Sequence, residues 1–309
     1  MIYTVTLNPA IDKTVVIENF APGCVNRIAS MREDAGGKGV NVSKCLKKLG
    51  ADTVAVMILA GLTGKRLESM LNAMKIHMLR VPAEGENRNN LKIIDPVNHT
   101  NTDINEPGPK IDEDLLENLK EKLGKSVCKG DIVVLSGSLP KGADKNLYAR
   151  WINYFRHRGV SVYLDADGEA MAKGIAAVPA LIKPNNDELA ALLGKEKLTQ
   201  EEMVAEGQRL LETGIEEVVV SLGGEGLLFI SKEGCYQAAA LTVPVKSTVG
   251  AGDSVVAAMA YGKEKKLDRE EKIRLAVAIG AASVMQDGSQ PPEAALVWEL
   301  AKHVQLKKL

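Results

Sequence analysis

The sequence has few cysteines and no long apolar run. Only four of its 309 residues are cysteine, and Cys24, Cys45, Cys128 and Cys235 lie far apart without a CxxC pair. The four histidines form no HExxH pattern. These residues indicate neither a disulfide framework nor a zinc site, and we expect reduced thiols. No window reaches the roughly 18 uninterrupted apolar residues of a transmembrane helix.

Neither sign of charge is in excess. The 39 lysines and arginines nearly balance 40 aspartates and glutamates, for a formal charge of −1, and there is no long basic run. A basic footprint for nucleic acid or an anionic membrane is therefore missing, and we expect neither as a partner. The first 12 residues carry no basic side chain and no long apolar stretch, unlike a signal peptide. We expect a cytoplasmic protein.

Short apolar runs alternate with segments of helical period over most of the chain. This alternation predicts an α/β fold, a three-layer sandwich with a mostly parallel central sheet. The predicted strands are 2–7, 53–59, 131–135, 160–164, 180–182 and 217–221, followed by a hairpin of 227–231 and 235–241. The predicted helices are 38–49, 62–75, 112–123, 145–158, 187–193 and 200–213, with two or three more between 251 and 303.

Two stretches break this alternation. Residues 14–33 and 88–105 alternate apolar with polar side chains, as antiparallel strands with one wet face do. We expect one domain over 1–309, in which about 13–35 and 88–106 form a small β-sheet lid. Such a lid would cover the carboxyl ends of the parallel strands, where open α/β sheets bind ligands.

The 28 glycines gather in clusters, and the first, AGGKGVN at 35–41, directly precedes a predicted helix. Glycine lets the backbone approach a ligand closely, and the free N–H groups of a helix start favour anions. Lys38 adds a positive charge, so a phosphorylated ligand is expected. The spacing does not match a Walker A loop, and a glycine turn before a helix is also a common purely structural feature.

The second cluster, TVGAGDS at 248–254, again runs into a helix. Asp253 would lie in the first turn, beside backbone N–H groups suited to a transferring phosphoryl group. It could accept a proton from an attacking hydroxyl, or it could simply favour the helix start. Val255 occupies the third glycine position of a GxGxxG dinucleotide motif, so that motif fails.

A third group follows two further strands, KPNNDE at 183–188 and SLGGEG at 221–226. Asn185 and Glu188 lie three apart at a helix start and could hold a hydrated Mg²⁺ through oxygen atoms. Either side chain could equally cap its helix. The segment 221–226 could be only a turn into the hairpin.

Taken in order, LNPAID, GGKGVN, SGSLP, KPNNDE, SLG and GAGD resemble the ribokinase-like (phosphofructokinase B type) carbohydrate kinases over roughly positions 1–290. Within that family the chain resembles the phosphosugar branch, first the 1-phosphofructokinases and next the tagatose-6-phosphate kinases. The resemblance implies the family's Rossmann-like α/β fold with a β-sheet lid. It also implies a homodimer through that lid, since many members pair there. One departure is Asn87, where the branch usually has threonine before Arg88.

The resemblance also implies roles for individual residues. Asp253 would be the catalytic base, with Gly250, Ala251 and Gly252 as the anion hole. The sugar phosphate would be bound by Asp12, Gly37, Lys38, Asn41, Arg88, Asn90 and Ser138, with Arg27 as a further phosphate contact. The nucleotide would meet Lys183, Asn185, Ser221, Gly223, Gly224, Gly226 and Thr248. Glu188 would position Mg²⁺ through water.

The activity that the resemblance implies is ATP-dependent phosphorylation of a ketohexose phosphate, first fructose 1-phosphate to fructose 1,6-bisphosphate, with ATP and Mg²⁺ as cofactors. Tagatose 6-phosphate and fructose 6-phosphate are the alternatives among sugars. A nucleoside acceptor would leave Lys38 and Arg88 without a phosphate. The alternative outside the enzymes is a catalytically silent sensor of sugar phosphate or nucleotide.

Overall fold

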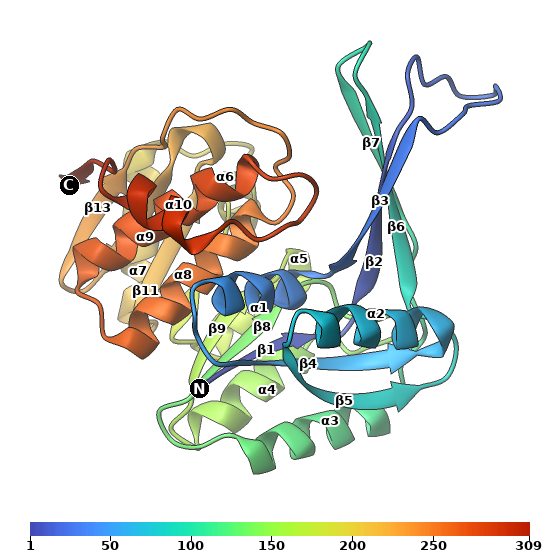
Figure 1. Ribbon diagram of the computed structural model, residues 1–309. Coiled ribbons are helices and arrows are strands. Elements are labelled where there is room, and N and C mark those ends of the chain that lie inside the picture. Colours follow the sequence, from blue (N-terminus) through green and yellow to red (C-terminus); the bar gives the residue numbers. More distant parts are fainter.

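A ten-stranded sheet runs through the larger part of the molecule (Figure 1). The computed structural model describes all residues from Met1 to Leu309. The strand order is β14-β13-β12-β11-β10-β9-β8-β1-β4-β5, and the seven strands from β11 to β5 are parallel. These are β1 (Ile2–Thr6), β4 (Thr53–Ala60), β5 (His77–Ala83), β8 (Ile132–Ser136), β9 (Ser161–Asp165), β10 (Leu181–Ile182) and β11 (Glu217–Ser221). Antiparallel strands β12 (Leu227–Ser231), β13 (Gly234–Ala238) and β14 (Leu306–Lys308) extend one edge.

Helices cover both faces of this sheet, so its central strands are buried on both sides. On β4, Val56 and Ile58 pack into one core, while Ala55 and Met57 face the other. This explains why such strands have continuous apolar runs rather than alternating ones. One face carries α3 (Glu113–Ser126), α4 (Leu147–Arg156), α5 (Gly168–Ala176), α6 (Asn186–Leu192) and α7 (Gln200–Glu212). The other carries α1 (Lys38–Lys48), α2 (Gly61–Ala73), α8 (Ala251–Lys265), α9 (Arg269–Val284) and α10 (Ala294–Ala301).

A second, four-stranded sheet stands away from the first (Figure 1). We call it the small sheet. Its order is β3-β2-β6-β7, with β2 parallel to β6 and the two outer pairs antiparallel. The strands are β2 (Ala10–Val16), β3 (Ser30–Gly36), β6 (Arg88–Asp95) and β7 (Thr100–Asn105). They come from the two stretches that break the strand–helix alternation.

The predicted layered α/β fold, with its hairpin and its extra sheet, is confirmed. Three elements were not predicted: β5, α5 and β14. Strand β5 lies at the sheet edge, and its half-exposed residues with Pro82 give no clear apolar run. Helix α5 is only nine residues long and rich in glycine and alanine. No helix in the molecule is long and apolar enough to cross a membrane.

Candidate active site

Two helix N-termini meet at the carboxyl ends of the parallel strands. Helix α1 begins after Gly37 and α8 begins after Gly250, and both glycines have positive φ values, 107° and 78°. This backbone conformation is strained for other residues, which explains glycine at both turns. Each turn leaves unpaired N–H groups facing the same side of the sheet, where an anion is favoured.

Asp253 lies in the first turn of α8 and is 7% exposed. Its Oδ2 accepts a hydrogen bond of 2.8 Å from the side-chain amide of Asn41 on α1. Burial, followed by repulsion from Asp165, raises the pKa of Asp253 to about 6. The Asn41 hydrogen bond and the positive charges of Lys38 and Lys183 act in the opposite direction. A carboxylate with a pKa near the working pH is suited to accept a proton.

Asp165 is the main site residue that the sequence did not single out. It ends strand β9, is 1% exposed, and forms ion pairs with Lys38 at 3.1 Å and Lys183 at 3.5 Å. Its Oδ2 is buried without a hydrogen-bond partner. An acidic pair directly after a predicted apolar strand, Asp165 and Asp167 in LDADG, was the available signal, because ligands meet the carboxyl ends of parallel strands.

Lys183 connects this acidic centre to the α8 turn. Its Nζ lies so close to Gly252 that a Cβ added there would stand 3.3 Å from it. Lys183 therefore places a positive charge beside the N–H groups of residues 250–252. The lysine charge and the helix dipole both favour an anion at this corner, and the buried carboxylates of Asp165 and Asp253 offset part of that effect.

A polar pocket of about 190 Å³ lies beside this corner. No hydrophobic residue lines it; the lining residues are Thr6, Asn8, Gly37, Lys38, Arg88, Ser136, Gly137, Ser138 and Asp167. Both Thr6 Oγ1 and Ser136 Oγ are buried without a hydrogen-bond partner, as is Asn8 Oδ1. Buried polar atoms are normally paired, so these groups are suited to a polar, hydrogen-bonding ligand.

Arg88, the first residue of β6, is fixed by a hydrogen bond of its own side chain and by the contacts of the preceding residue, Asn87. Its Nε donates to the carbonyl of Asn8 at 3.1 Å. Its neighbour Asn87 is 1% exposed and binds the end of β4 through its side chain: Oδ1 accepts from the Ala60 N–H, and Nδ2 donates to the Ile58 carbonyl. Asn87 thus attaches the start of the small sheet to the main sheet immediately before the arginine.

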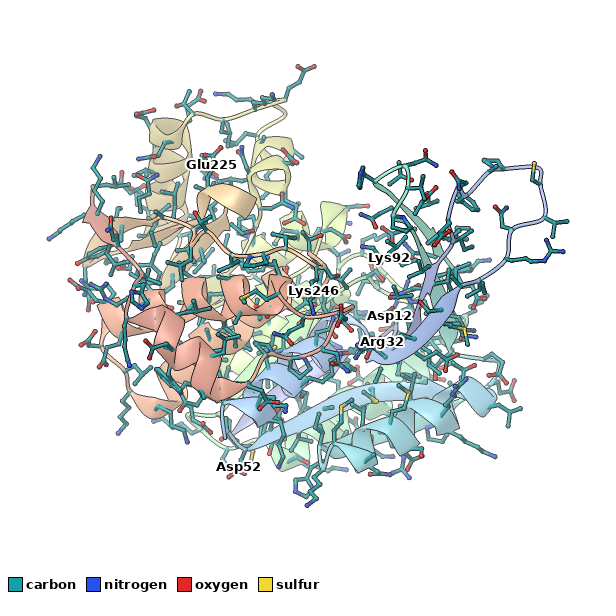
Figure 2. The ribbon with its side chains drawn as sticks, turned by 45° about the horizontal axis from the view of Figure 1, so that its top comes forward. Asp12, Arg32, Asp52, Lys92, Glu225 and Lys246 are labelled. Carbon is teal, nitrogen blue, oxygen red and sulfur yellow. The ribbon has the colours of Figure 1, made fainter.

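Asp12 and Asn90 face each other at the base of the small sheet. Asn90 Nδ2 donates to Asp12 Oδ1 at 2.8 Å, and the two residues are direct register partners on β6 and β2. Burial raises the pKa of Asp12, against the effect of this hydrogen bond and of Lys44 and Arg88. Figure 2 shows Asp12 where the small sheet meets the helical part of the molecule.

The residues expected to meet nucleotide and metal lie at the ends of β10 and β11. Asn185 and Glu188 form a capping box on α6: Asn185 Oδ1 accepts from the Glu188 N–H, and Glu188 Oε2 accepts from the Asn185 N–H. Asn185 and Glu188 therefore cap helix α6, which is one of the two roles that the sequence left open for them. Asn185 also pairs with Ser221 in a parallel bridge. Gly223 and Gly224 border open space, and Thr248 is exposed just before the α8 turn.

Gly226 has a different reason to be glycine. Its φ is 101°, and a Cβ there would collide with the backbone of Ala238 to Ala240. Close packing of the chain on itself is thus sufficient to explain this glycine.

Arg27 does not join the pocket. It is exposed in the loop between β2 and β3, at the far end of the small sheet from Asp12 (Figure 1). Within a single chain Arg27 therefore lies away from Lys38 and Arg88, and its role as a phosphate contact stays a prediction. Arg27 lies away from them because β2 and β3 form a long antiparallel pair, which carries the connecting loop away from the strand ends.

Residues 5–295 match the model of the pfkB family carbohydrate kinases. The chain belongs to this family. The chain is 36% identical to the 1-phosphofructokinase of Bacillus subtilis (strain 168), over 93% of each chain. It is 33% identical to a tagatose-6-phosphate kinase of Staphylococcus epidermidis (strain RP62A), again over 93% of each chain.

A solved structure supports the same conclusion. The crystal structure of phosphofructokinase-2 from Escherichia coli in complex with substrates and products matches this pfkB kinase with a TM-score of 0.93 and 30% identity, covering 98% of both chains. The fold is ribokinase-like, and the protein is a carbohydrate kinase, an enzyme that transfers a phosphoryl group to an alcohol.

Proposed function

We propose that this pfkB kinase transfers the γ-phosphoryl group of ATP to the 6-hydroxyl of fructose 1-phosphate, giving fructose 1,6-bisphosphate. The observation that carries this proposal is the pocket at Arg88 and Lys38, which has two cations and no hydrophobic lining. Such a pocket suits a sugar that already carries a phosphate, since charge-assisted contacts to phosphate are strong. The relatives named 1-phosphofructokinase favour fructose 1-phosphate among such sugars.

Asp253 is the proposed base. Its buried carboxylate lies at the same helix turn as the N–H groups of Gly250, Ala251 and Gly252, so a hydroxyl held by the carboxylate would also face the anion hole. The base takes the hydroxyl proton as the oxygen attacks phosphorus. The N–H groups and Lys183 stabilise the charge that develops on the transferring phosphoryl group.

The sugar is placed under the small sheet, which we assign as the lid of a single domain. Asp12 and Asn90 would bind sugar hydroxyls from the lid base. Asn41 has a buried Oδ1 without a partner, which suits a donating hydroxyl. Gly37 and Ser138 line the same pocket as Arg88 and Lys38 and would assist at the phosphate.

ATP would bind at the ends of β10 and β11, with its phosphates toward the α8 turn. Its proposed contacts are Lys183, Asn185, Ser221, Gly223, Gly224, Gly226 and Thr248. We place Mg²⁺ beside Glu188, because the capping box leaves its Oε1 unused and carboxylate oxygen atoms are the ligands that this ion prefers. Asn186 Oδ1 on the same helix and Asp165 Oδ2 at the end of β9 are also buried without partners. When bound, the ion would neutralise phosphate oxygens.

The lid suits a second copy of the chain. Five apolar residues of its loops and edge strands are more than half exposed: Val25, Ile28, Met31, Val97 and Ile104. Exposed apolar residues along an extended sheet with open edges are typical of an interface between subunits. We therefore propose a homodimer that pairs through the lids.

A panel of fructose 1-phosphate, tagatose 6-phosphate and fructose 6-phosphate, each with ATP and Mg²⁺, tests the substrate. We expect the highest kcat/KM with fructose 1-phosphate in a coupled assay for ADP. A higher kcat/KM with another sugar phosphate would make that sugar the substrate and would leave the proposed phosphoryl transfer unchanged. Absence of turnover on all three, in a protein that still binds them, would support the silent-sensor alternative.

A further inference from the structure

A charged side chain, Lys44, is buried beneath the active site. It lies on α1 one turn after Asn41 and is only 2% exposed. Its Nζ donates to the carbonyl of Ala35 at 2.8 Å and to Ser289 Oγ at 3.0 Å. A buried ammonium group is costly unless its donors are satisfied and its charge is balanced, so its partners determine what it does.

The two partners belong to different sides of the site. Ala35 lies on β3 of the lid, directly before Gly36, which packs so closely on Asp12 that any Cβ would collide with the carboxylate. Ser289 follows α9 and packs against the α8 turn: its Cβ would lie 3.8 Å from a Cβ added to Gly250. Lys44 thus joins the sugar side to the anion-hole side.

Three carboxylates lie in the field of this ammonium group: Asp34, Asp12 and Asp253. Asp34 also pairs with Arg32, and it lies under Gly288, where a Cβ would stand 2.7 Å from its Oδ2. The Lys44 charge lowers the pKa of Asp12, which burial raises. The same lysine therefore favours the ionised carboxylate that would accept hydrogen bonds from the sugar.

We propose that Lys44 is a positioning residue that holds the sugar-binding base of the lid against the anion-hole loop. The proposal rests on the proposed function insofar as Asp12 is taken to bind the sugar. Lys44 is buried and does not line the polar pocket. Its loss should raise the KM for the sugar phosphate more than the KM for ATP. The reason is that Ala35 adjoins the Gly36–Asp12 contact on the sugar side, whereas Ser289 meets the α8 turn only through a carbon contact.

The test compares Lys44→Met with Lys44→Arg, and uses Lys48→Met as control. Lys48 lies on the same helix, but its side chain is 40% exposed and pairs with the surface residue Glu293. We expect Lys44→Met to raise the KM for the sugar phosphate about 10-fold or more, the scale for losing hydrogen bonds to a buried charge, with the KM for ATP within about 2-fold. Lys44→Arg should recover part of the loss, and Lys48→Met should match wild type.

The pH profile gives a second readout that a purely structural role would not move. The charged or titratable groups facing Asp12 are Lys44, Arg88 and Asp34, and those facing Lys44 also include Cys45 and Asp253. At low pH, kcat/KM for the sugar phosphate should fall as Asp12 is protonated. Because the Lys44 charge lowers the pKa of Asp12, Lys44→Met should shift this fall (the acid limb of the profile) to higher pH, and Lys44→Arg should leave it in place.

An unchanged KM for the sugar phosphate in folded Lys44→Met would overturn the proposal. So would an equal rise of the KM values for the sugar phosphate and for ATP, if the low-pH side of the kcat/KM profile stays in place. If Lys44→Met does not fold, Ser289→Ala is measured instead. It removes one of the two hydrogen bonds of Lys44 and should raise the KM for the sugar phosphate about 3-fold, and more than the KM for ATP. An unchanged sugar KM in that variant would also overturn the proposal.

The substrate assignment is judged separately. Each KM of a variant is divided by the KM of the wild type, measured on the sugar phosphate of the panel that the wild type phosphorylates best. If the wild type does not phosphorylate fructose 1-phosphate, the proposed substrate is refuted. The KM ratio of Lys44→Met on the sugar that is phosphorylated still tests the positioning role of Lys44.

Discussion

Asn41 donates a 2.8 Å hydrogen bond to Asp253 although 212 positions separate them in the chain. The bond joins the first turns of α1 and α8, the helices that follow the two glycine clusters. It favours the ionised form of Asp253 and opposes burial. The sugar-side loop and the catalytic loop are thereby connected through the proposed base itself.

Replacing Asp253 by asparagine should lower kcat by about 100-fold or more, the scale for removing a general base. The amide oxygen can still accept the Asn41 hydrogen bond, so we expect a normal fold by circular dichroism. Steady-state kinetics with ATP and fructose 1-phosphate measure the loss. Wild-type turnover in this variant would refute the assignment of the base.

The same substitution has an expected effect on stability. The pKa of Asp253 is higher in the folded protein than in the unfolded chain, so the folded state binds this proton more tightly. Its contribution to stability is complete below the unfolded pKa, near 4, and is lost as pH rises through about 6. Asp253→Asn should therefore raise the melting temperature at pH 8 more than at pH 4, and calorimetry at both values tests this.

Turnover should rise with pH through about 6, because the base must be ionised. Asn41→Leu removes a hydrogen bond to the carboxylate and should move this acid limb to higher pH. Profiles of kcat for both proteins, measured at saturating ATP, give the comparison. If kcat of Asn41→Leu rises at the same pH as kcat of the wild type, the Asn41 hydrogen bond does not affect the ionisation that limits turnover.

Arg88→Ala should raise the KM for the sugar phosphate far more than the KM for ATP, because a charge-assisted contact to phosphate is lost. We expect about 10-fold or more for the sugar. Arg80→Ala is the matched control, since Arg80 pairs with Glu68 at the sheet edge and does not line the pocket. Equal effects of the two substitutions would place the sugar's phosphate elsewhere.

Asn87→Ala leaves the Ala60 N–H and the Ile58 carbonyl without their partners, and should destabilise the protein by about 1–3 kcal/mol. Because Asn87 precedes Arg88, the sugar KM should rise as well. Asn87→Thr, the residue usual in the phosphosugar branch, should lose less. Denaturant unfolding together with the KM of each variant separates the two effects, and an unchanged sugar KM would show that Arg88 is positioned without Asn87.

Ile104→Glu should weaken the proposed dimer, because it replaces an apolar side chain that is 52% exposed on edge strand β7 of the lid by a charged one. Leu62→Glu is the control: Leu62 is 74% exposed but lies on α2, outside the lid. Light scattering over a range of concentrations reports the mass. A dimer that survives Ile104→Glu and not Leu62→Glu would move the interface to α2.

Much of the fold was predictable because burial leaves a periodic signal. Strands β1 and β8 are buried throughout and mostly apolar, since helices cover both faces, and α3 has a regular apolar stripe. Edge strand β5 and the small helix α5 gave no such signal, because one is half exposed and the other is made largely of small residues.

The residues of the site also differ in how much of a signal they leave in the sequence. Asp253 and Lys38 stand in local motifs whose glycines and charges indicate phosphate chemistry without any knowledge of the fold. Lys183 was named only through the family resemblance. Asp165 and Lys44 stand in no such motif. Their importance comes from partners far away in the chain, Lys38 in one case and Ser289 in the other.

By itself, the sequence determined the layered α/β class, the two helix turns shaped for anions and the family. These depend on local properties: apolar period, glycine conformation and the order of short motifs. Only the tertiary structure decided that Asn41 meets Asp253, that Arg27 lies away from the pocket within one chain, and that a buried lysine joins the two sides of the site. Such facts depend on strand order and on the length of the β2–β3 pair, which bring distant residues together or keep them apart.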